Sequence, residues 1–265
     1  MSGQQGASKK WAVLAATVIV LSSCGVAFSQ ATAPAPSAAA ASTRATPTVD
    51  QILEKYAQAT GGRAAWQKLT SRVSKGTVEV SSMNLSGTIE MRQKAPNLIL
   101  ATVTVSGAAF SQGFDGKVAW SNDPQNGVRE LTGDELAETR RDADFSRLLD
   151  MHKLYPKLSV TGKEVIGDRT AYEVDAMPEG SSEPDKIYFD AETGLAVRSV
   201  TRHHMPDGTA EPFQEDYEDY REIDGVKMPF MIRQSTPEAE FTVRINEMQH
   251  NVPLDDSIFA KPAVQ

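Results

Sequence analysis

The feature that most constrains the fold is a period-two alternation of apolar and polar residues, repeated in short segments along most of the chain. Phe241, Val243 and Ile245 alternate with polar residues, and the same pattern appears over residues 172–176. Successive side chains on a strand point to opposite faces of a sheet, so this alternation is typical of strands with one buried and one solvated face. It favours antiparallel sheets, because strands of parallel sheets are usually buried on both faces.

Turn signals such as Asp115-Gly116 and Asp224-Gly225 separate these segments. No regular alternation of strands with helices is found, which argues against a parallel α/β sheet. We therefore expect a mainly β fold, built on a single large, curved antiparallel sheet. The predicted strands lie near residues 72–80, 85–93, 97–105, 108–114, 117–121, 127–131, 157–165, 169–176, 184–190, 196–203, 212–222, 227–234 and 239–249.

A few helices are predicted beside the sheet. Thr48 and Gln51 form a capping box that opens one helix, Gly61-Gly62 ends it, and a short helix follows near 64–69. A third helix is expected over 133–149, and its polar middle suggests a movable lid. These helices are the segments available to cover the concave face of an open sheet. The pattern leaves an apolar cavity and a fully packed core as equal alternatives.

The N-terminus has the features of an export signal. Lys9 and Lys10 precede an apolar stretch over 11–21 that is too short for a comfortable membrane span. Leu21-Ser22-Ser23-Cys24 resembles a bacterial lipobox, which implies that residues 1–23 are a signal peptide and that Cys24 carries the lipid. Gly25 at the next position favours the outer membrane. Two alternatives are ordinary cleavage near Ser29, which would release the protein into the periplasm, and an uncleaved anchor.

Composition and charge exclude several classes of function. The chain has 265 residues and a formal net charge of −8. Loss of residues 1–23 removes two lysines and no acidic residue, which leaves a charge of −10. Nucleic-acid binding needs a basic surface, so we expect no nucleic-acid partner. One cysteine excludes an internal disulfide framework. Residues 24–47 form the lipidated cysteine and a linker rich in Ala, Pro, Ser and Thr, and 48–265 form one domain.

The search for catalytic chemistry gives no enzyme motif, no metal site and no cofactor motif. His203 and His204 are adjacent on a predicted strand and would point to opposite faces, so they cannot easily share a metal ion. They are expected at an exposed hairpin end. The acidic run over 215–220 is expected to be a solvated sheet edge with a protective stripe of charge. The chain is therefore predicted to be non-enzymatic.

Several sequence motifs resemble the LolA/LolB superfamily of periplasmic lipoprotein carriers, and especially its outer-membrane lipoprotein-sorting-like members. The resemblance covers essentially all of residues 48–262. It rests on the runs TVDQILEKYAQATGGRAAWQKLTSRVSKGTVEV (48–80), GFDGKVAW (113–120), LYPKLSVTGKEVIGDRTAYEVDA (154–176), IYFDAETGLAVRS (187–199), EDYREIDGVKMPFMIRQ (218–234) and HNVPLDDSIFAKP (250–262). The lipobox departs from the soluble carrier and is closer to the membrane-anchored acceptor.

The resemblance implies an unclosed β-barrel whose helices cover a hydrophobic cavity for acyl chains. The expected partners are a lipid, an acyl chain or a lipoprotein cargo, with the membrane reached through the N-terminal lipid, and we expect a monomer. An envelope sensor or protein-interaction module is the alternative, with a hydrolase of unfamiliar site as a third. A cavity below about 300 Å³ would count against lipid carriage. The aromatic candidates for the cavity lining are Trp66, Trp120, Phe145, Tyr188, Phe230 and Phe241.

Overall fold

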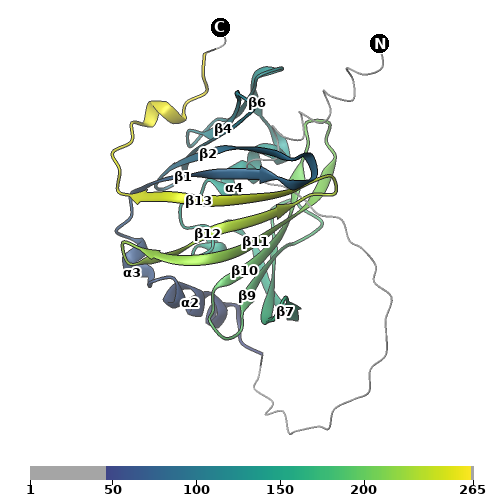
Figure 1. Cartoon of the computed structure of the whole chain (residues 1–265). Helices are drawn as coiled ribbons and strands as arrows, with labels where there is room; N and C mark the ends of the chain where they lie inside the picture. The colour runs from purple at the N-terminus through teal and green to yellow at the C-terminus, as the bar shows by residue number, and fades with distance from the viewer. Residues whose placement is uncertain (1–45, 264–265) are drawn as a thin grey trace.

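The structure, a computed structural model, describes residues 46–263, and these form one sheet of 13 antiparallel strands (Figure 1). The predicted fold class is therefore confirmed. The strands are β1 Ser71–Val80, β2 Leu85–Lys94, β3 Leu98–Val105, β4 Ala108–Phe114, β5 Ala119–Asp123, β6 Gly127–Leu131, β7 Lys157–Ile166, β8 Arg169–Met177, β9 Asp185–Asp190, β10 Ala196–His204, β11 Ala210–Ile223, β12 Val226–Ser235 and β13 Glu240–His250.

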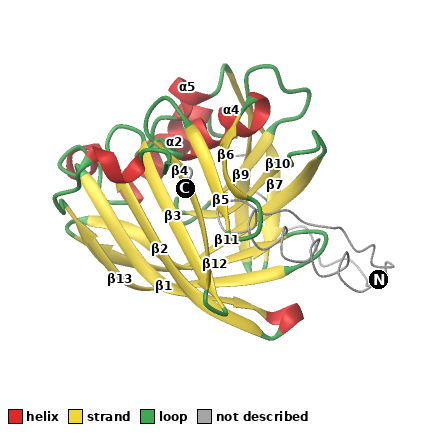
Figure 2. Ribbon diagram, turned by 90° about the horizontal axis from the view of Figure 1, so that it is seen from above, coloured by secondary structure: helices red, strands yellow, loops and turns green. Residues whose placement is uncertain are grey.

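The sheet consists of two meanders joined side by side. Strands β1 to β6 follow one another in space, as do β7 to β13, and β1 pairs with β13 so that Val80 lies opposite Phe241. Strands β6 and β7 are the two outer strands of this order, and they do not pair with each other. The sheet is therefore an unclosed barrel, as predicted. Its strong curvature gives it one concave face (Figure 2).

The short α-helices lie together along one side of this curved sheet (Figure 2). The first helix begins with the predicted capping box. The Gln51 backbone N–H donates to Thr48 Oγ1 at 3.3 Å, and the Thr48 N–H donates to Gln51 Oε1 at 3.0 Å. The helical elements are α2 Val49–Ala59, α3 Arg63–Trp66, α4 Gly133–Asp142, α5 Met151–Leu154, and the 3₁₀ turns η1 Ser81–Met83 and η2 Asp256–Phe259. None of the helices within residues 46–263 is long and apolar enough to cross a membrane.

The predicted helix over 133–149 was too long, since α4 ends at Asp142. The next residues form turns in which Asp144 Oδ1 accepts a hydrogen bond from the Ser146 N–H at 3.0 Å. A short acidic side chain that binds nearby backbone in this way competes with helical hydrogen bonds. The Phe145 N–H donates to the carbonyl of Pro96 at 3.0 Å. Residues 143–150, called the inner segment below, therefore form a separate element tied to the β2–β3 turn.

Helix α4 bridges the two halves of the sheet. It contacts both β5 and β10, which lie on opposite sides of the β1–β13 pair in the strand order. Gln112 of β4 donates to Thr139 Oγ1 at 3.1 Å, and His203 of β10 contacts Glu138 Oε1 through Nδ1 at 2.7 Å. The helix thus spans the part of the barrel that strand pairing leaves open.

Two apolar clusters fill most of the concave side. The helix-side cluster combines α2, α3 and the inner segment with β8, β9 and β11, and includes Tyr56, Trp66, Phe145 and Phe189. The distal cluster joins β1, β2, β3, β11, β12 and β13 away from these helices, and its members are Val78, Val80, Ile89, Val103, Val105, Phe213, Phe230, Ala239, Phe241, Val243 and Ile245. Burial of each large apolar side chain stabilises the fold by roughly 1.5–3 kcal/mol.

The signal peptide, Cys24 and the linker up to residue 45 lie outside the described residues. The predictions of residues 1–23 as a signal, of lipidation at Cys24, and of the alternative cleavage near Ser29 therefore stay predictions.

Candidate functional site

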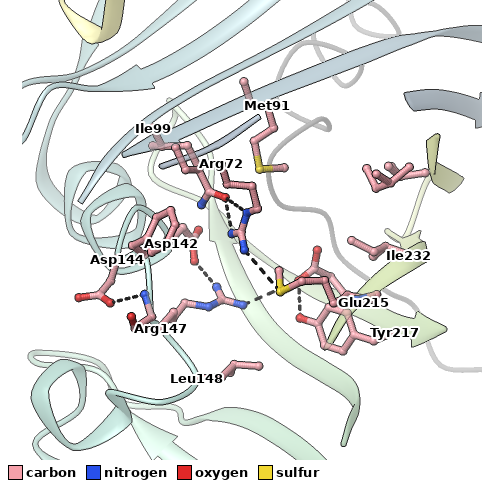
Figure 3. Close-up of a pocket in the computed structure, with 18 of the residues that line it drawn as sticks. Arg72, Met91, Ile99, Asp142, Asp144, Arg147, Leu148, Glu215, Tyr217 and Ile232 are labelled. Atoms are coloured by element: carbon pink, nitrogen blue, oxygen red, sulfur yellow. Dashed lines mark hydrogen bonds and ion pairs between the residues drawn. The ribbon is translucent and has the colours of Figure 1, made fainter. Parts of the chain in front are cut away.

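A cavity of about 230 Å³ lies between the helix-side cluster and the distal cluster, inside the curve of the sheet (Figure 3). Its wall is mostly apolar, but charged side chains from both the sheet and the inner segment enter it. The lining residues are Tyr56, Trp66, Arg72, Ile89, Met91, Gln93, Ile99, Ala101, Asp142, Asp144, Phe145, Ser146, Arg147, Leu148, Leu149, Glu215, Tyr217, Tyr220, Met228, Pro229, Ile232, Gln234, Val243 and Ile245. A cavity therefore exists, and the alternative of a fully packed core is wrong.

Arg72 is the most unusual residue in this wall, because only 8% of it is exposed. Its Nε donates to Gln93 Oε1 at 3.0 Å, Nη2 donates to the same oxygen, and Nη1 contacts the Met228 sulfur at 3.5 Å. The guanidinium carbon lies 5.2 Å from the centre of the Phe145 ring. Burial lowers the pKa of Arg72 to about 10, because the charged form loses hydration.

Arg147 enters the cavity from the inner segment and is paired with carboxylates (Figure 3). Its Nη1 binds Asp142 Oδ1, and its Nη2 lies 4.0 Å from Glu215 Oε2 of β11. Burial alone would lower the pKa of Arg147, but Asp142, two tyrosines and Glu215 hold it well above its ordinary value. Burial raises the pKa of Asp142 to about 6 even though Arg147 opposes this. These contacts tie the inner segment to the end of α4 through Asp142 and to β11 through Glu215.

Glu215 continues this network along β11. Its Oε2 accepts from the Tyr217 hydroxyl at 2.8 Å, its Oε1 accepts from Gln234 Nε2 at 3.1 Å, and Tyr217 shares a hydrogen bond with Ser199 at 2.9 Å. The expectation of a sheet edge over 215–220 was therefore wrong, and Glu215 is not solvated as expected. Strand β11 lies between β10 and β12 rather than at the edge, and Glu215 has the same parity as buried Phe213.

Two of the six aromatic candidates, Trp66 and Phe145, line the cavity. Trp66 is fixed by its indole Nε1–H, which donates to the carbonyl and hydroxyl oxygens of Thr60, both at 3.2 Å. Phe230 and Phe241 are packed within the distal cluster and do not line the cavity. Ligand contact by Trp66 and Phe145 stays a prediction.

Trp120 and Tyr188 lie on the opposite face of the sheet, which corrects their expected place in the cavity. Trp120 donates from Nε1 to the Phe259 carbonyl at 2.8 Å and is covered by η2. Tyr188 packs with Ala171 and Val197, while its neighbours on β9, residues 187 and 189, belong to the helix-side cluster. The strand parity places both rings away from the cavity.

The two adjacent histidines also differ from expectation. His203 Nδ1 and His204 Nδ1 both contact the Glu138 carboxylate, at 2.7 and 3.2 Å, and the His204 N–H donates to Oε2 at 3.1 Å. Only 13% and 26% of the two side chains are exposed, so they are not at a free hairpin end. Helix α4 lies over this end of β10, and both rings turn toward its carboxylate. This cluster, here called the α4 latch, holds the bridging helix on β10.

The α4 latch predicts a pH dependence. Hydrogen bonds and the charge of Glu138 raise the pKa of His204, whereas bonds from both histidines lower the pKa of Glu138 against the effect of burial. The His204 contribution is complete below about 6.5 and is lost as pH rises through its folded pKa, whereas the Glu138 contribution is lost as pH falls below about 4.5. We expect the contribution of the α4 latch to the free energy of unfolding to drop by about 1 kcal/mol between pH 5.5 and pH 8.5.

Urea unfolding at the two pH values checks this, with Glu138→Gln expected to reduce the pH-dependent change by about this amount and to leave the part due to Asp142. Asp134→Asn is the matched control, because Asp134 is 80% exposed and lies 4.0 Å from His204 Nε2. An unchanged pH dependence in Glu138→Gln would contradict the assignment.

No group of three or more His, Cys, Asp or Glu side chains within residues 46–263 is arranged to hold a metal ion. The acidic groups of the cavity are instead engaged by cations of the chain, with Lys153 Nζ 2.7 Å from Asp144 Oδ2. The described part of the cavity wall is therefore apolar, with paired charged groups set in it.

Sequence reasoning missed Arg72, Arg147, Glu215 and Glu138. Arg72 could have been found from the local sequence. It is an even-numbered residue of β1, as buried Val78 and Val80 are, so it places a cation on the apolar face of this strand. Glu215 has the same signal relative to Phe213. The partners of Arg147 and Glu138 are distant in sequence, and no pattern in the chain predicts those contacts.

No protein-family model and no curated protein matches the chain by sequence. Solved structures do match its fold. A DUF1329 family protein from Desulfovibrio piger is 13% identical, with a TM-score of 0.54 over 81% of this chain and 98% of its own. A LolA superfamily protein from Nitrosomonas europaea is 14% identical, with a TM-score of 0.53 over 82% of this chain and 99% of its own.

The chain has the LolA-like fold. A third structure, an outer membrane lipoprotein-sorting protein domain from Vibrio parahaemolyticus, agrees with this at 9% identity and a TM-score of 0.50, over 79% of this chain and 94% of its own. The LolA-like sheet accounts for nearly the whole of each of these proteins. The similarity is one of architecture, and a shared fold does not assign a ligand to this LolA-like chain.

Proposed function

We propose that the chain is a non-enzymatic envelope lipoprotein that binds a lipid or acyl chain inside its half-barrel. In this proposal Cys24 carries the membrane anchor, and the linker holds the domain near the outer membrane on its periplasmic side. The protein acts as a monomer, in lipoprotein sorting or transport. The observation that carries the proposal is the mostly apolar pocket between the concave face and the helices.

The composition of the wall fits an apolar ligand. Side chains such as Ile89, Ile99, Ile232 and Val243 supply aliphatic surface on several strands. Apolar burial supplies roughly 25 cal/mol per Å² before the costs of association. Met91 and Met228 add adaptable side chains that follow ligands of different shape.

The cavity volume limits what enters. At about 230 Å³ the cavity is below the value of about 300 Å³ under which the volume counts against carriage of a whole lipid. It holds part of one acyl chain, and a longer ligand requires the inner segment to move outward. In this proposal residues 143–150 are the cover that moves, because they belong to no strand, although the buried side chains of Phe145 and Leu149 and the Arg147 contacts must be released first.

The small volume is also the observation that favours a second candidate, an envelope sensor or protein-interaction module with no lipid inside. In that case the inner segment stays closed, and the cavity is a packing defect around charged groups. The two candidates differ in what accompanies the protein when it is taken from its host.

Native mass spectrometry of the full chain purified from its host envelope separates them. We expect one non-covalent lipid or acyl chain for each protein, together with a diacylglyceryl-modified N-terminus at Cys24. A ligand-free chain with a bound protein partner would instead support the interaction module. An unmodified N-terminus at Gln30 would contradict the lipid anchor without deciding the ligand.

A further inference from the structure

Arg72 is a buried cation whose contacts within residues 46–263 include no anion. The guanidinium touches an amide oxygen, a thioether and an aromatic ring. Buried charges in proteins are normally paired, because an unpaired ion loses its hydration without compensation. The thioether is a weak acceptor, so Nη1 has donor capacity left over.

The carboxylates of the same wall are already engaged. Asp142 and Glu215 face Arg147, and Asp144 faces Lys153. Figure 3 shows Arg72 and Arg147 entering the cavity from different elements, the first from the sheet and the second from the inner segment. Among the charged groups of the wall, Arg72 is therefore the cation that is left to pair with an anion of a ligand.

Apolar surface surrounds this cation. Met91, Ile99 and Ala101 continue the wall on β2 and β3, and Ile232 and Val243 continue it on β12 and β13. A ligand that binds both features has an anionic head and an aliphatic tail. Guanidinium groups match carboxylate and phosphate oxygens geometrically, which makes these the anions that Arg72 recognises best.

We propose that this cavity takes a single-chain amphiphile with a carboxylate or phosphate head, bound by Arg72. The inference rests on the proposed function and deepens it, since it names the chemical class of the ligand. A volume of about 230 Å³ favours one aliphatic chain over the two of a diacyl lipid. The anion would also complete the interactions of a guanidinium whose pKa burial lowers to about 10.

Calorimetric titration of the full chain carrying Cys24→Ser tests this, with dodecanoate, dodecyl phosphate, dodecanol and inorganic phosphate as probes. The substitution removes the thiol that would carry the proposed lipid, so that no covalently attached acyl chain competes with the probes. Dodecanoate or dodecyl phosphate is expected to bind at least about 10-fold more tightly than dodecanol, because a hydrogen bond to a charged group is worth about 1.5–3 kcal/mol. Inorganic phosphate lacks the tail and is expected to bind far more weakly.

The variant Arg72→Met is expected to lose this preference for the anion while it keeps dodecanol binding. Arg72→Lys retains the charge and is expected to keep part of the preference. Lys75→Met is the matched control, because Lys75 is an exposed cation on the same strand. The comparison of acid with alcohol in the parent chain does not depend on how well the Arg72 variants fold.

Each other outcome has a defined meaning. Equal binding of dodecanoate, dodecyl phosphate and dodecanol would overturn the assignment to Arg72 and leave acyl binding in place. Tight binding of inorganic phosphate would indicate a site for free anions and overturn the amphiphile. If no tailed probe binds, both the inference and the proposed function are wrong.

Discussion

Ile232→Trp is expected to reduce dodecanoate binding by at least about 100-fold. Ile232 of β12 lines the cavity and is only partly buried, so a larger ring at this position enters the space that the ligand needs. Loss of roughly 100 Å² of apolar contact costs about 2.7 kcal/mol at 25–30 cal/mol per Å², which corresponds to this factor. Titration of the Cys24→Ser chain with and without the substitution measures the change.

Met231→Trp is the matched control for this effect. Met231 is the adjacent residue on β12 and points to the other face, where its sulfur contacts Arg244. The control is expected to bind dodecanoate as the parent chain does. If Ile232→Trp binds the ligand normally, the acyl chain does not occupy the described cavity.

Arg147→Met is expected to lower the free energy of unfolding by about 3 kcal/mol at pH 8. The substitution leaves Asp142 and Glu215 without their cation, and only 17% and 14% of these side chains are exposed. Removal of one partner from such a pair leaves a poorly hydrated charge unpaired. This unpaired charge is the main cause of the loss in unfolding free energy. Urea unfolding followed by circular dichroism measures it.

Two further variants give this prediction its controls. Arg233→Met removes an arginine that is 60% exposed and pairs with Glu218 on the same strand as Glu215, so less than about 1 kcal/mol is expected. Asp142→Asn in the Arg147→Met background is expected to recover part of the loss. A loss no larger than that of Arg233→Met would mean that the Arg147 contacts do not hold the inner segment.

The cost of Arg147→Met has a defined pH dependence. Burial raises the folded pKa of Asp142 to about 6 from an ordinary value of 3.8, so the native state takes up this proton before the unfolded state does. The contribution of Asp142 to stability therefore increases as pH falls from about 6 toward 3.8. Arg147 holds this pKa down, so its removal raises the pKa further, and we expect the loss caused by Arg147→Met to shrink as pH falls from 8 to about 6, where Asp142 takes up its proton in the parent chain as well.

The sheet was predictable because its signals are local. The alternation of apolar and polar residues predicted the strands, and pairs such as Asp224-Gly225 predicted the turns. Asp224 and Gly225 both have positive φ in the structure. The helix over 133–149 was not predictable beyond Asp142, because its ending depends on the side chain of Asp144 and on a contact with the β2–β3 turn. Apolar spacing alone does not reveal either interaction.

The candidate site was only partly predictable, since residue type does not fix the face of a strand. The run Ile187-Tyr188-Phe189 is apolar throughout, so the sequence does not indicate which face Tyr188 takes. Trp66 and Phe145 lie on helical or turn elements that cover the sheet, and they reached the cavity as expected. The charged wall residues depend on contacts between distant segments, which only the folded chain brings together.

Photo-crosslinking of a diazirine-bearing dodecanoate to the full Cys24→Ser chain tests the central proposal most directly, because it reports where the acyl chain lies. Peptides modified by the probe are identified by mass spectrometry, with excess dodecanoate as competitor. The predicted result is competed labelling of the inner segment and of the inward residues of β2, β3 and β12, including Phe145, Met91 and Ile232. Labelling confined to the opposite face, around Trp120 or Tyr188, would contradict acyl binding inside the half-barrel.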